Sequence, residues 1–164
     1  MSRPESNTEK IWLERAIALA VDNAAAGGRP FGAVVVLDEV IVGEGVNRYV
    51  ADNDPTAHAE IVALRNAAQA RSTPDLAGTV LVASTEPCPM CQAAALLAGV
   101  VRIVYATTEL QAAVRGYDAR VLLADLGRPF AERTMMAVAG LAVDGEALPY
   151  EVAAQAAGAQ DATG

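Results

Sequence analysis

The sequence predicts an α/β protein in which helices cover both faces of a mixed sheet. Three observations support this fold class. Short runs rich in valine, isoleucine and leucine alternate with longer stretches of helical character. Hydrophobic residues make up 53% of the chain, which suits a compact core. The length of 164 residues favours one domain, large enough to bury that core without disulfides.

Eight elements are expected, in the order α-β-β-α-β-α-β-α. They are a helix after Ser6 that ends near Ala26, strands over 32–37 and 40–46, a helix over 57–71, a strand over 79–83, a helix over 89–98, a strand over 100–106 and a helical stretch over 109–126.

The boundaries in the first half come from capping and turn residues. Ser6 and Glu9 fit a capping box at the start of the first helix, and a pair of glycines ends it. Asp38-Glu39 joins the two β-branched runs as a hairpin turn. Because this turn lacks glycine, the register of the hairpin stays open. Thr56 is the expected N-cap of the helix over 57–71.

In the second half, the strand–helix–strand unit over 79–106 predicts two parallel strands joined by a crossover helix. The helical stretch after it should break near Gly116. Residues 155–164 are rich in alanine and glycine, and we expect a flexible C-terminal tail. The remaining chain, 1–154, is predicted to be a single domain.

The charge of the chain restricts its partners. Net charge is −8 and only 12 residues are lysine or arginine, so nucleic acid is a disfavoured partner. A small neutral substrate is compatible with this acidic surface. No stretch approaches the roughly 20 apolar residues that span a membrane. The polar first ten residues differ from a secretory signal, and we expect a cytoplasmic protein.

The residues that carry chemistry are His58, Cys88 and Cys91, since the chain has no other histidine or cysteine. All three fall at the beginnings of predicted helices, where free N–H groups favour thiolates and anionic ligands. Three protein ligands predict a catalytic zinc site, because the fourth tetrahedral position stays open. Glu60, two residues after His58, is the expected catalytic acid–base that moves protons from water to the substrate and the departing ammonia.

The cysteines allow two other interpretations. Cys88 and Cys91 form a C-x-x-C pair, which is also typical of thiol redox proteins. That interpretation leaves the His58-Ala59-Glu60 segment unexplained. A purely structural zinc site normally has four protein ligands, and only three of the sulfur or imidazole type are present. The zinc-dependent catalytic site therefore explains more of the sequence.

His58-Ala59-Glu60 together with Pro87-Cys88-Pro89-Met90-Cys91 matches the H-x-E…P-C-x-x-C signature of zinc nucleobase deaminases. With Pro30-Phe31-Gly32-Ala33, the run 53–60 and Gly116-Tyr117-Asp118, it resembles the guanine-deaminase branch of the cytidine deaminase-like superfamily over about residues 11–134. The resemblance implies a three-layer α/β/α fold around a mixed five-stranded sheet. It also implies one Zn²⁺ per subunit and a homodimer that exchanges C-terminal segments.

The resemblance further implies which residues bind the substrate. Asn47 would hydrogen-bond a ring carbonyl or nitrogen, Phe31 and the His58 ring would enclose the flat base, and the Ala59 backbone would orient it. Core packing for Phe31 and turn capping for Asn47 are the competing interpretations. Guanine-type relatives carry an acidic residue where Ala119 stands here. Either Asp118 substitutes for it, or the preferred substrate is a smaller ring.

The leading functional hypothesis is hydrolytic deamination of a free nucleobase or related amino-heterocycle, with release of ammonia. Guanine, cytosine, isocytosine and aminotriazines are the candidate substrates. A tRNA adenosine deaminase is the alternative, because 43–48 and 54–64 resemble that branch as well. The third hypothesis is a zinc-binding module without catalytic activity, which the presence of Glu60 disfavours.

Overall fold

The computed structural model describes residues 7–129, 132–135, 149 and 151–154. The chain divides into two compact units, Met1–Ala124 and Asp125–Gly164. The single domain over 1–154 stays a prediction, and the predicted tail over 155–164 lies outside the described residues.

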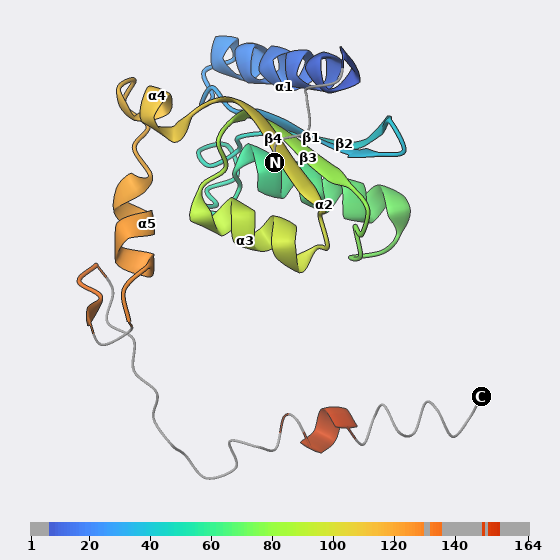
Figure 1. The fold of residues 1–164 in the computed structure, drawn as a ribbon, viewed down its shortest axis with the longest axis vertical. Helices are drawn as coiled ribbons and strands as arrows, with labels where there is room; N and C mark the ends of the chain where they lie inside the picture. Colours follow the sequence, from blue (N-terminus) through green and yellow to red (C-terminus); the bar gives the residue numbers. More distant parts are fainter. Residues whose placement is uncertain (1–6, 130–131, 136–148, 150, 155–164) are drawn as a thin grey trace. The chain divides into compact units, whose positions relative to one another are not determined.

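The first unit contains the sheet and the helices that pack on it (Figure 1). Its elements follow the expected order: α1 (Asn7–Ala25), β1 (Gly32–Leu37), β2 (Val40–Val46), α2 (Ala59–Arg71), β3 (Val80–Thr85), α3 (Pro89–Leu97), β4 (Arg102–Thr107) and α4 (Glu109–Ala113), with α5 (Arg120–Leu126) at its end. The predicted break is confirmed, since Gly116 adopts a φ of 92° between α4 and α5.

The sheet is mixed, with the strand order β2-β1-β3-β4. β1 pairs antiparallel with both β2 and β3, whereas β3 and β4 are parallel as predicted. The described residues form four strands, one fewer than the five that the resemblance implied; residues 136–148 lie outside the described part of the chain. The fold is thus an α/β fold with a mixed four-stranded sheet packed by helices.

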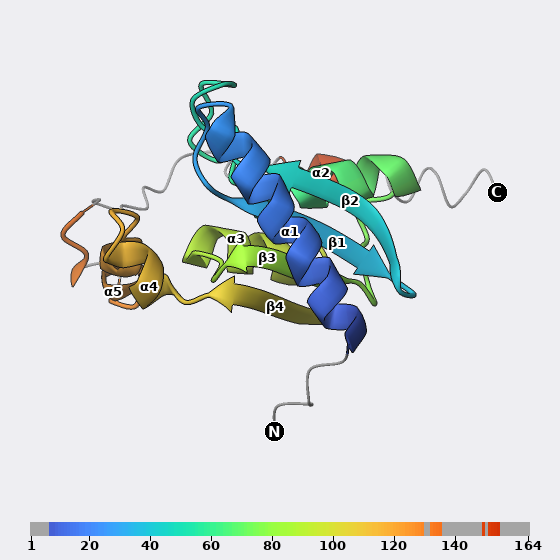
Figure 2. The same cartoon turned by 90° about the horizontal axis from the view of Figure 1, so that it is seen from above.

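Alternation along the strands divides the core between the two faces of the sheet. Val34, Val36 and Val82 are buried on the face that packs against Trp12 and neighbouring residues of α1. The opposite face carries a second cluster with the buried alanines and leucine of α2 and Ala95 of α3. Figures 1 and 2 show α1 crossing one side of the sheet, with α2 and α3 on the other. Side chains that alternate along a strand point to opposite faces, which accounts for this division.

Two glycines of β2 allow α2 to approach the sheet closely. A Cβ atom at Gly45 would collide with the carbonyl oxygen of Ala59 and the backbone nitrogen of Ala63. One at Gly43 would lie 2.5 Å from the Ala63 carbonyl oxygen. A glycine inside a strand often marks such an approach of another backbone. The start of α2 is therefore seated directly on β2.

The hairpin forms with the two-residue turn that the sequence left open. Asp38 and Glu39 have φ values of 48° and 65°, so both adopt the left-handed region required by a type I′ turn. Leu37 consequently pairs with Val40, and one register shift follows between Val35 and Val36. The strand ladder, rather than the local preference of the two acidic residues, sets this turn.

One predicted helix start is wrong. α2 begins at Ala59, with His58 as its N-cap, and not at 57 with Thr56 as the cap. The reason is local: Asp54 Oδ1 accepts hydrogen bonds from the Thr56 backbone N–H (2.8 Å) and from its hydroxyl (2.7 Å). Thr56 therefore belongs to a turn closed by Asp54, and the helix starts two residues later.

The second unit is described over a few short stretches. Its buried Asp125 accepts hydrogen bonds on Oδ1 from the Thr134 N–H and hydroxyl, and on Oδ2 from the Met135 N–H. This carboxylate thus connects the end of α5 to Thr134 and Met135. Across the described part of both units, no helix combines the length and the apolar character needed to cross a lipid bilayer.

Candidate active site

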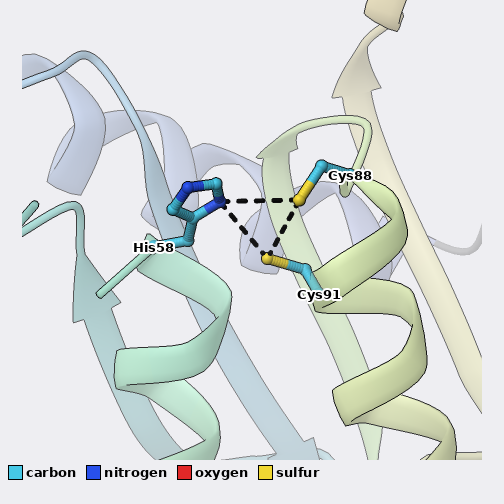
Figure 3. Close-up of side chains that lie close together, drawn as sticks. All are labelled: His58, Cys88 and Cys91. Atoms are coloured by element: carbon cyan, nitrogen blue, oxygen red, sulfur yellow. Dashed lines mark hydrogen bonds between the residues drawn. The ribbon is translucent and has the colours of Figure 1, made fainter. Parts of the chain in front are cut away.

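The predicted ligands lie at the starts of α2 and α3, as expected from the sequence. His58 is the N-cap of α2 and Cys88 the N-cap of α3, with Pro89 as the first helical residue and Cys91 in the first turn. Neither N-cap side chain hydrogen-bonds to its own helix. Figure 3 shows the three side chains pointing toward one another from the two helices.

The distances within this cluster fit a tetrahedral metal centre. His58 Nδ1 lies 3.5 Å from Cys88 Sγ and 3.5 Å from Cys91 Sγ, and the two sulfurs are 3.7 Å apart. Tetrahedral zinc with ordinary bond lengths separates sulfur from nitrogen by about 3.6 Å and sulfur from sulfur by about 3.8 Å. The spacing therefore matches zinc, and one imidazole with two thiols is a donor set that zinc prefers.

The two thiols differ in acidity. The hydrogen bond between the Cys88 and Cys91 sulfurs, supported by His58, lowers the pKa of Cys88 to about 4. The same hydrogen bond and burial raise the pKa of Cys91. Cys88 thus forms a thiolate more readily than Cys91 does. Binding of a divalent metal should therefore release protons.

Glu60 is the only acidic residue in the first turn of α2. It is 8% exposed and lines the same cavity as His58 and Cys88. Burial raises the pKa of the Glu60 carboxyl, and the negative charge of Cys88 adds to this rise. A carboxyl group that holds a proton more readily than usual, beside a metal-binding cluster, is suited to proton transfer.

A cavity of about 380 Å³ opens beside the cluster, a volume within the range of small-molecule sites. Four predicted site residues besides the two ligands line it: Phe31, Asn47, Glu60 and Asp118. Ala59 does not line it, because its side chain is buried in the core beneath α2. The substrate roles assigned to these residues stay predictions.

Both interpretations of Asn47 have a counterpart in its contacts. Asn47 Oδ1 accepts a hydrogen bond from the Tyr49 N–H at 3.2 Å, which is the turn-capping arrangement. Its side-chain amide nitrogen has no partner among the described residues. This 6% exposed side chain therefore caps the turn with its oxygen and has N–H groups available for a ligand.

Phe31 likewise belongs to both the core and the cavity. It packs against the cluster beneath α2, and its ring meets that of Tyr117 edge-on, with the centroids 5.0 Å apart. Tyr117 lies in the Gly116–Asp118 run, after α4. The aromatic pair thus joins the residue before β1 to the segment after α4, and both rings belong to residues that line the cavity.

The cavity also contains charged residues that the sequence analysis did not single out. Arg29, Glu86 and Glu109 line it, and the Arg29 guanidinium stacks on the Tyr49 ring at 4.0 Å from its centroid. Glu86 directly precedes the Pro87–Cys91 motif, so its place beside Cys88 could have indicated it. Arg29 and Glu109 carried no such signal, because they reach the cavity only through the packing of the loops.

Comparison with known proteins agrees with this site. The model of the cytidine and deoxycytidylate deaminase zinc-binding region matches residues 6–107. Guanine deaminase of Bacillus subtilis (strain 168) is 41% identical over 127 residues, which cover 77% of this chain and 81% of the relative. The chain therefore belongs to the cytidine and deoxycytidylate deaminase family. It is a zinc-dependent deaminase of that family, with His58, Cys88 and Cys91 as the zinc-binding cluster.

Solved structures give the same answer for the fold. The X-ray structure of guanine deaminase from Bacillus subtilis matches with a TM-score of 0.84 and 35% identity, covering 89% of this chain and 93% of that one. A guanine deaminase structure from Nitrosomonas europaea matches at a TM-score of 0.63 and 31% identity, over 73% and 66%. A tRNA-specific adenosine deaminase of Buchnera aphidicola is 39% identical over 60% of this chain and 61% of the relative.

Proposed function

We propose that this chain deaminates a free nucleobase, with guanine as the first candidate. The observation that carries the proposal is the charge of the cavity beside the zinc-binding cluster. Its described lining includes four carboxylates, Glu60, Glu86, Glu109 and Asp118, against one arginine, Arg29. An uncharged ring rich in N–H groups suits such a wall, whereas a phosphate group would be repelled.

The relatives support guanine over the smaller rings. The protein with 41% identity is a guanine deaminase, and solved structures at 32–33% identity are complexes with 8-azaguanine or 2,6-diaminopurine. These names describe the relatives. Cytosine, isocytosine and aminotriazines are the alternatives because Ala119, which lines the cavity, lacks the acidic group that guanine-type relatives carry at that position.

The chemistry supplied by zinc at such a site is Lewis acidity, which lowers the pKa of water toward about 7. The chain's own contribution begins with Glu60. Its buried carboxylate would take a proton from the attacking water and pass it to a ring nitrogen. It would then take the second proton from the hydroxyl group added to the ring and deliver it to the departing amine, which leaves a carbonyl and ammonia. The raised pKa of Glu60 suits this exchange, because the group must both accept and return a proton.

Asn47 and Phe31 would hold the base in place. The unpartnered amide N–H groups of Asn47 would donate to a ring carbonyl, and the rim formed by Phe31 and Tyr117 would cover the flat ring. These rings would exclude water from the cavity, and the hydrogen bonds between the base and the protein would be stronger as a result. The backbone of Ala59 would help to orient the base from the start of α2.

A tRNA substrate is disfavoured by the same charges. A tRNA deaminase must bind phosphates around the flipped base, and the salt dependence of such binding comes from lysine and arginine. Here the net charge is −8 and the cavity wall is acidic. The proposal therefore places this chain among free-base deaminases.

A homodimer built from single deaminase domains over 1–154 belongs to the same proposal. Leu96 and Leu97 of α3 are 79% and 89% exposed, and Val101 after it is 67% exposed. Leucines at such exposure are typical of a surface that a second subunit covers. One chain has a mass of 16.9 kDa, and light scattering of the purified protein should give twice that mass. A monomer at micromolar concentration would contradict the dimer.

The experiment that tests the function is ammonia release by the zinc-loaded chain. Guanine, cytosine, isocytosine, an aminotriazine, a nucleoside and tRNA form the panel, and Glu60→Gln prepared in parallel controls for contaminating activity. Release from guanine that is lost in Glu60→Gln supports the proposal. Release from tRNA alone would overturn it, and release from a smaller ring alone would replace guanine by that ring.

A further inference from the structure

Glu109 lines the cavity and carries a buried carboxylate oxygen without a hydrogen-bond partner among the described residues. It is the first residue of α4, and its backbone N–H donates to Glu86 Oε2 at 2.8 Å. Its own Oε1 is buried and has no hydrogen-bond partner among the described residues. A buried acceptor left without a donor is costly, so such an oxygen favours a ligand that brings an N–H group.

The neighbouring carboxylate, Asp118, is engaged elsewhere. Arg120 holds it with two side-chain hydrogen bonds, at 2.8 Å to Oδ1 and 2.6 Å to Oδ2, and its backbone N–H adds a third at 3.0 Å. These bonds lower the pKa of Asp118 to about 2. Its oxygens are therefore already satisfied, and a ligand would have to compete with Arg120 for them.

Position 119 offers no alternative. Ala119 lines the cavity with a methyl group, so the wall has no acceptor side chain at that point. Glu86 already accepts the Glu109 N–H on its Oε2 atom. Of the carboxylates that line this side of the cavity, Glu109 is the one with a buried oxygen that lacks a partner.

We propose that Glu109 contacts the substrate directly and accepts hydrogen bonds from the N–H groups of the amino-heterocycle. The inference rests on the proposed function and adds a specificity residue to it. Rings with several N–H donors, such as guanine, would satisfy the buried Oε1 atom, whereas rings with fewer donors would leave it unpaired. Discrimination of this kind is strong because a ring without the donor leaves a polar group of the site unpaired, which is energetically unfavourable.

The test uses the zinc-loaded chain and four variants, of which Asp118→Asn reports on the neighbouring carboxylate. Glu109→Ala removes the acceptor, Glu109→Gln keeps one carbonyl acceptor, and Glu14→Ala removes an exposed glutamate of α1 as a matched control. Steady-state kinetics with guanine are measured for each. Calorimetry of 8-azaguanine binding is measured in a Glu60→Gln background, which provides a readout independent of turnover.

We expect Glu109→Ala to lower kcat/KM for guanine and to weaken 8-azaguanine binding by about tenfold or more, the effect of losing a charged hydrogen bond. Glu109→Gln should recover part of the loss, and Glu14→Ala should match the wild type. Zinc content and Tm report whether each variant is folded. If Glu109→Ala does not fold, the inference still requires that Glu109→Gln has a lower kcat/KM for guanine than the wild type.

The outcomes separate this inference from the proposed function. Wild-type turnover of guanine with both Glu109 variants within twofold would overturn the role of Glu109 and leave the function intact. No turnover of any ring on the panel by the wild-type chain would overturn the proposed function, and the inference with it. A larger loss in Asp118→Asn than in Glu109→Ala would assign the contact to Asp118 instead.

Discussion

His58 Nδ1 lies 3.5 Å from Cys91 Sγ, although 33 residues separate them in the chain. The two residues belong to different helices, which pack on the same face of the sheet with their N-termini at the same end (Figure 3). This proximity results from the parallel β3–α3–β4 crossover and from the close packing of the α2 backbone against β2. The zinc-binding cluster therefore depends on the packing of both helices.

Replacing a cysteine ligand should remove the metal. Cys91→Ser retains the size of the side chain approximately but replaces the thiolate that zinc prefers. We expect the purified variant to contain well under one zinc per chain by elemental analysis. Met90→Leu, a conservative change between the two cysteines, should keep its zinc. A fully loaded Cys91→Ser variant would show that Cys91 is not a ligand.

Glu60→Gln should separate metal binding from catalysis. The amide keeps the shape of the side chain and removes its ability to exchange a proton. Loss of a general acid–base group lowers the rate by about 10²–10⁴-fold. We expect that decrease in kcat, with zinc content and Tm close to the wild type. Activity within a few-fold of the wild type would exclude Glu60 as the proton carrier.

Gly45→Ala should destabilise the fold at the seat of α2. The added Cβ meets the backbone of Ala59 and Ala63, which cannot move aside without shifting the helix that carries His58. We expect a loss of about 1–3 kcal/mol in the free energy of unfolding, measured by urea denaturation, and weaker zinc binding. Val40→Ala, at a 62% exposed position of the same strand, should cost less than about 0.5 kcal/mol. Equal effects would contradict the close approach.

The ion pair between Arg15 of α1 and Glu44 of β2 should weaken in acid. Arg15 donates two hydrogen bonds to Glu44, of 2.7 and 2.6 Å, and lowers the pKa of that carboxyl. A lowered pKa means that the stabilisation is present above the ordinary glutamate range and is lost as the pH falls through the folded-state value. Both side chains are more than a third exposed, so less than about 1 kcal/mol is involved.

The corresponding measurement is the difference in Tm between the wild type and Glu44→Gln at two pH values. The wild type should be the more stable protein at pH 7, and the difference should shrink at about pH 3. Glu14→Gln removes an exposed glutamate without a partner among the described residues and should show no such trend. A Tm difference between the wild type and Glu44→Gln that grows as the pH falls would contradict the lowered pKa of Glu44.

Glu39→Gly should stabilise the protein. Glu39 has a φ of 65°, a conformation that costs an ordinary residue about 1 kcal/mol and costs glycine little. We expect an increase in Tm by differential scanning calorimetry. Glu14→Gly, inside α1, should lower Tm because glycine is unfavourable in a helix. A decrease for Glu39→Gly would mean that its side chain contributes more than the backbone strain costs.

Much of this site could be predicted from the sequence because its ligands lie at local boundaries. His58, Cys88 and Cys91 occur once in a pattern whose chemistry is specific, and each falls where a helix begins. The strands over 32–37 and 40–46 were predicted with their observed bounds, since β-branched runs report directly on strand formation. The N-cap at Thr56 was wrong because Asp54 competes for its hydroxyl.

The sequence by itself determined the class of protein, the metal ligands and the order of the elements, because these depend on residue types and spacings within short segments. Only the tertiary structure decided which carboxylates line the cavity and which of them are free. Glu109 lies 51 positions from His58 and carries no motif, whereas Asp118 stands in one and is held by Arg120. Availability for a ligand is a property of packing and hydrogen bonding, and neither can be read from a residue's place in the chain.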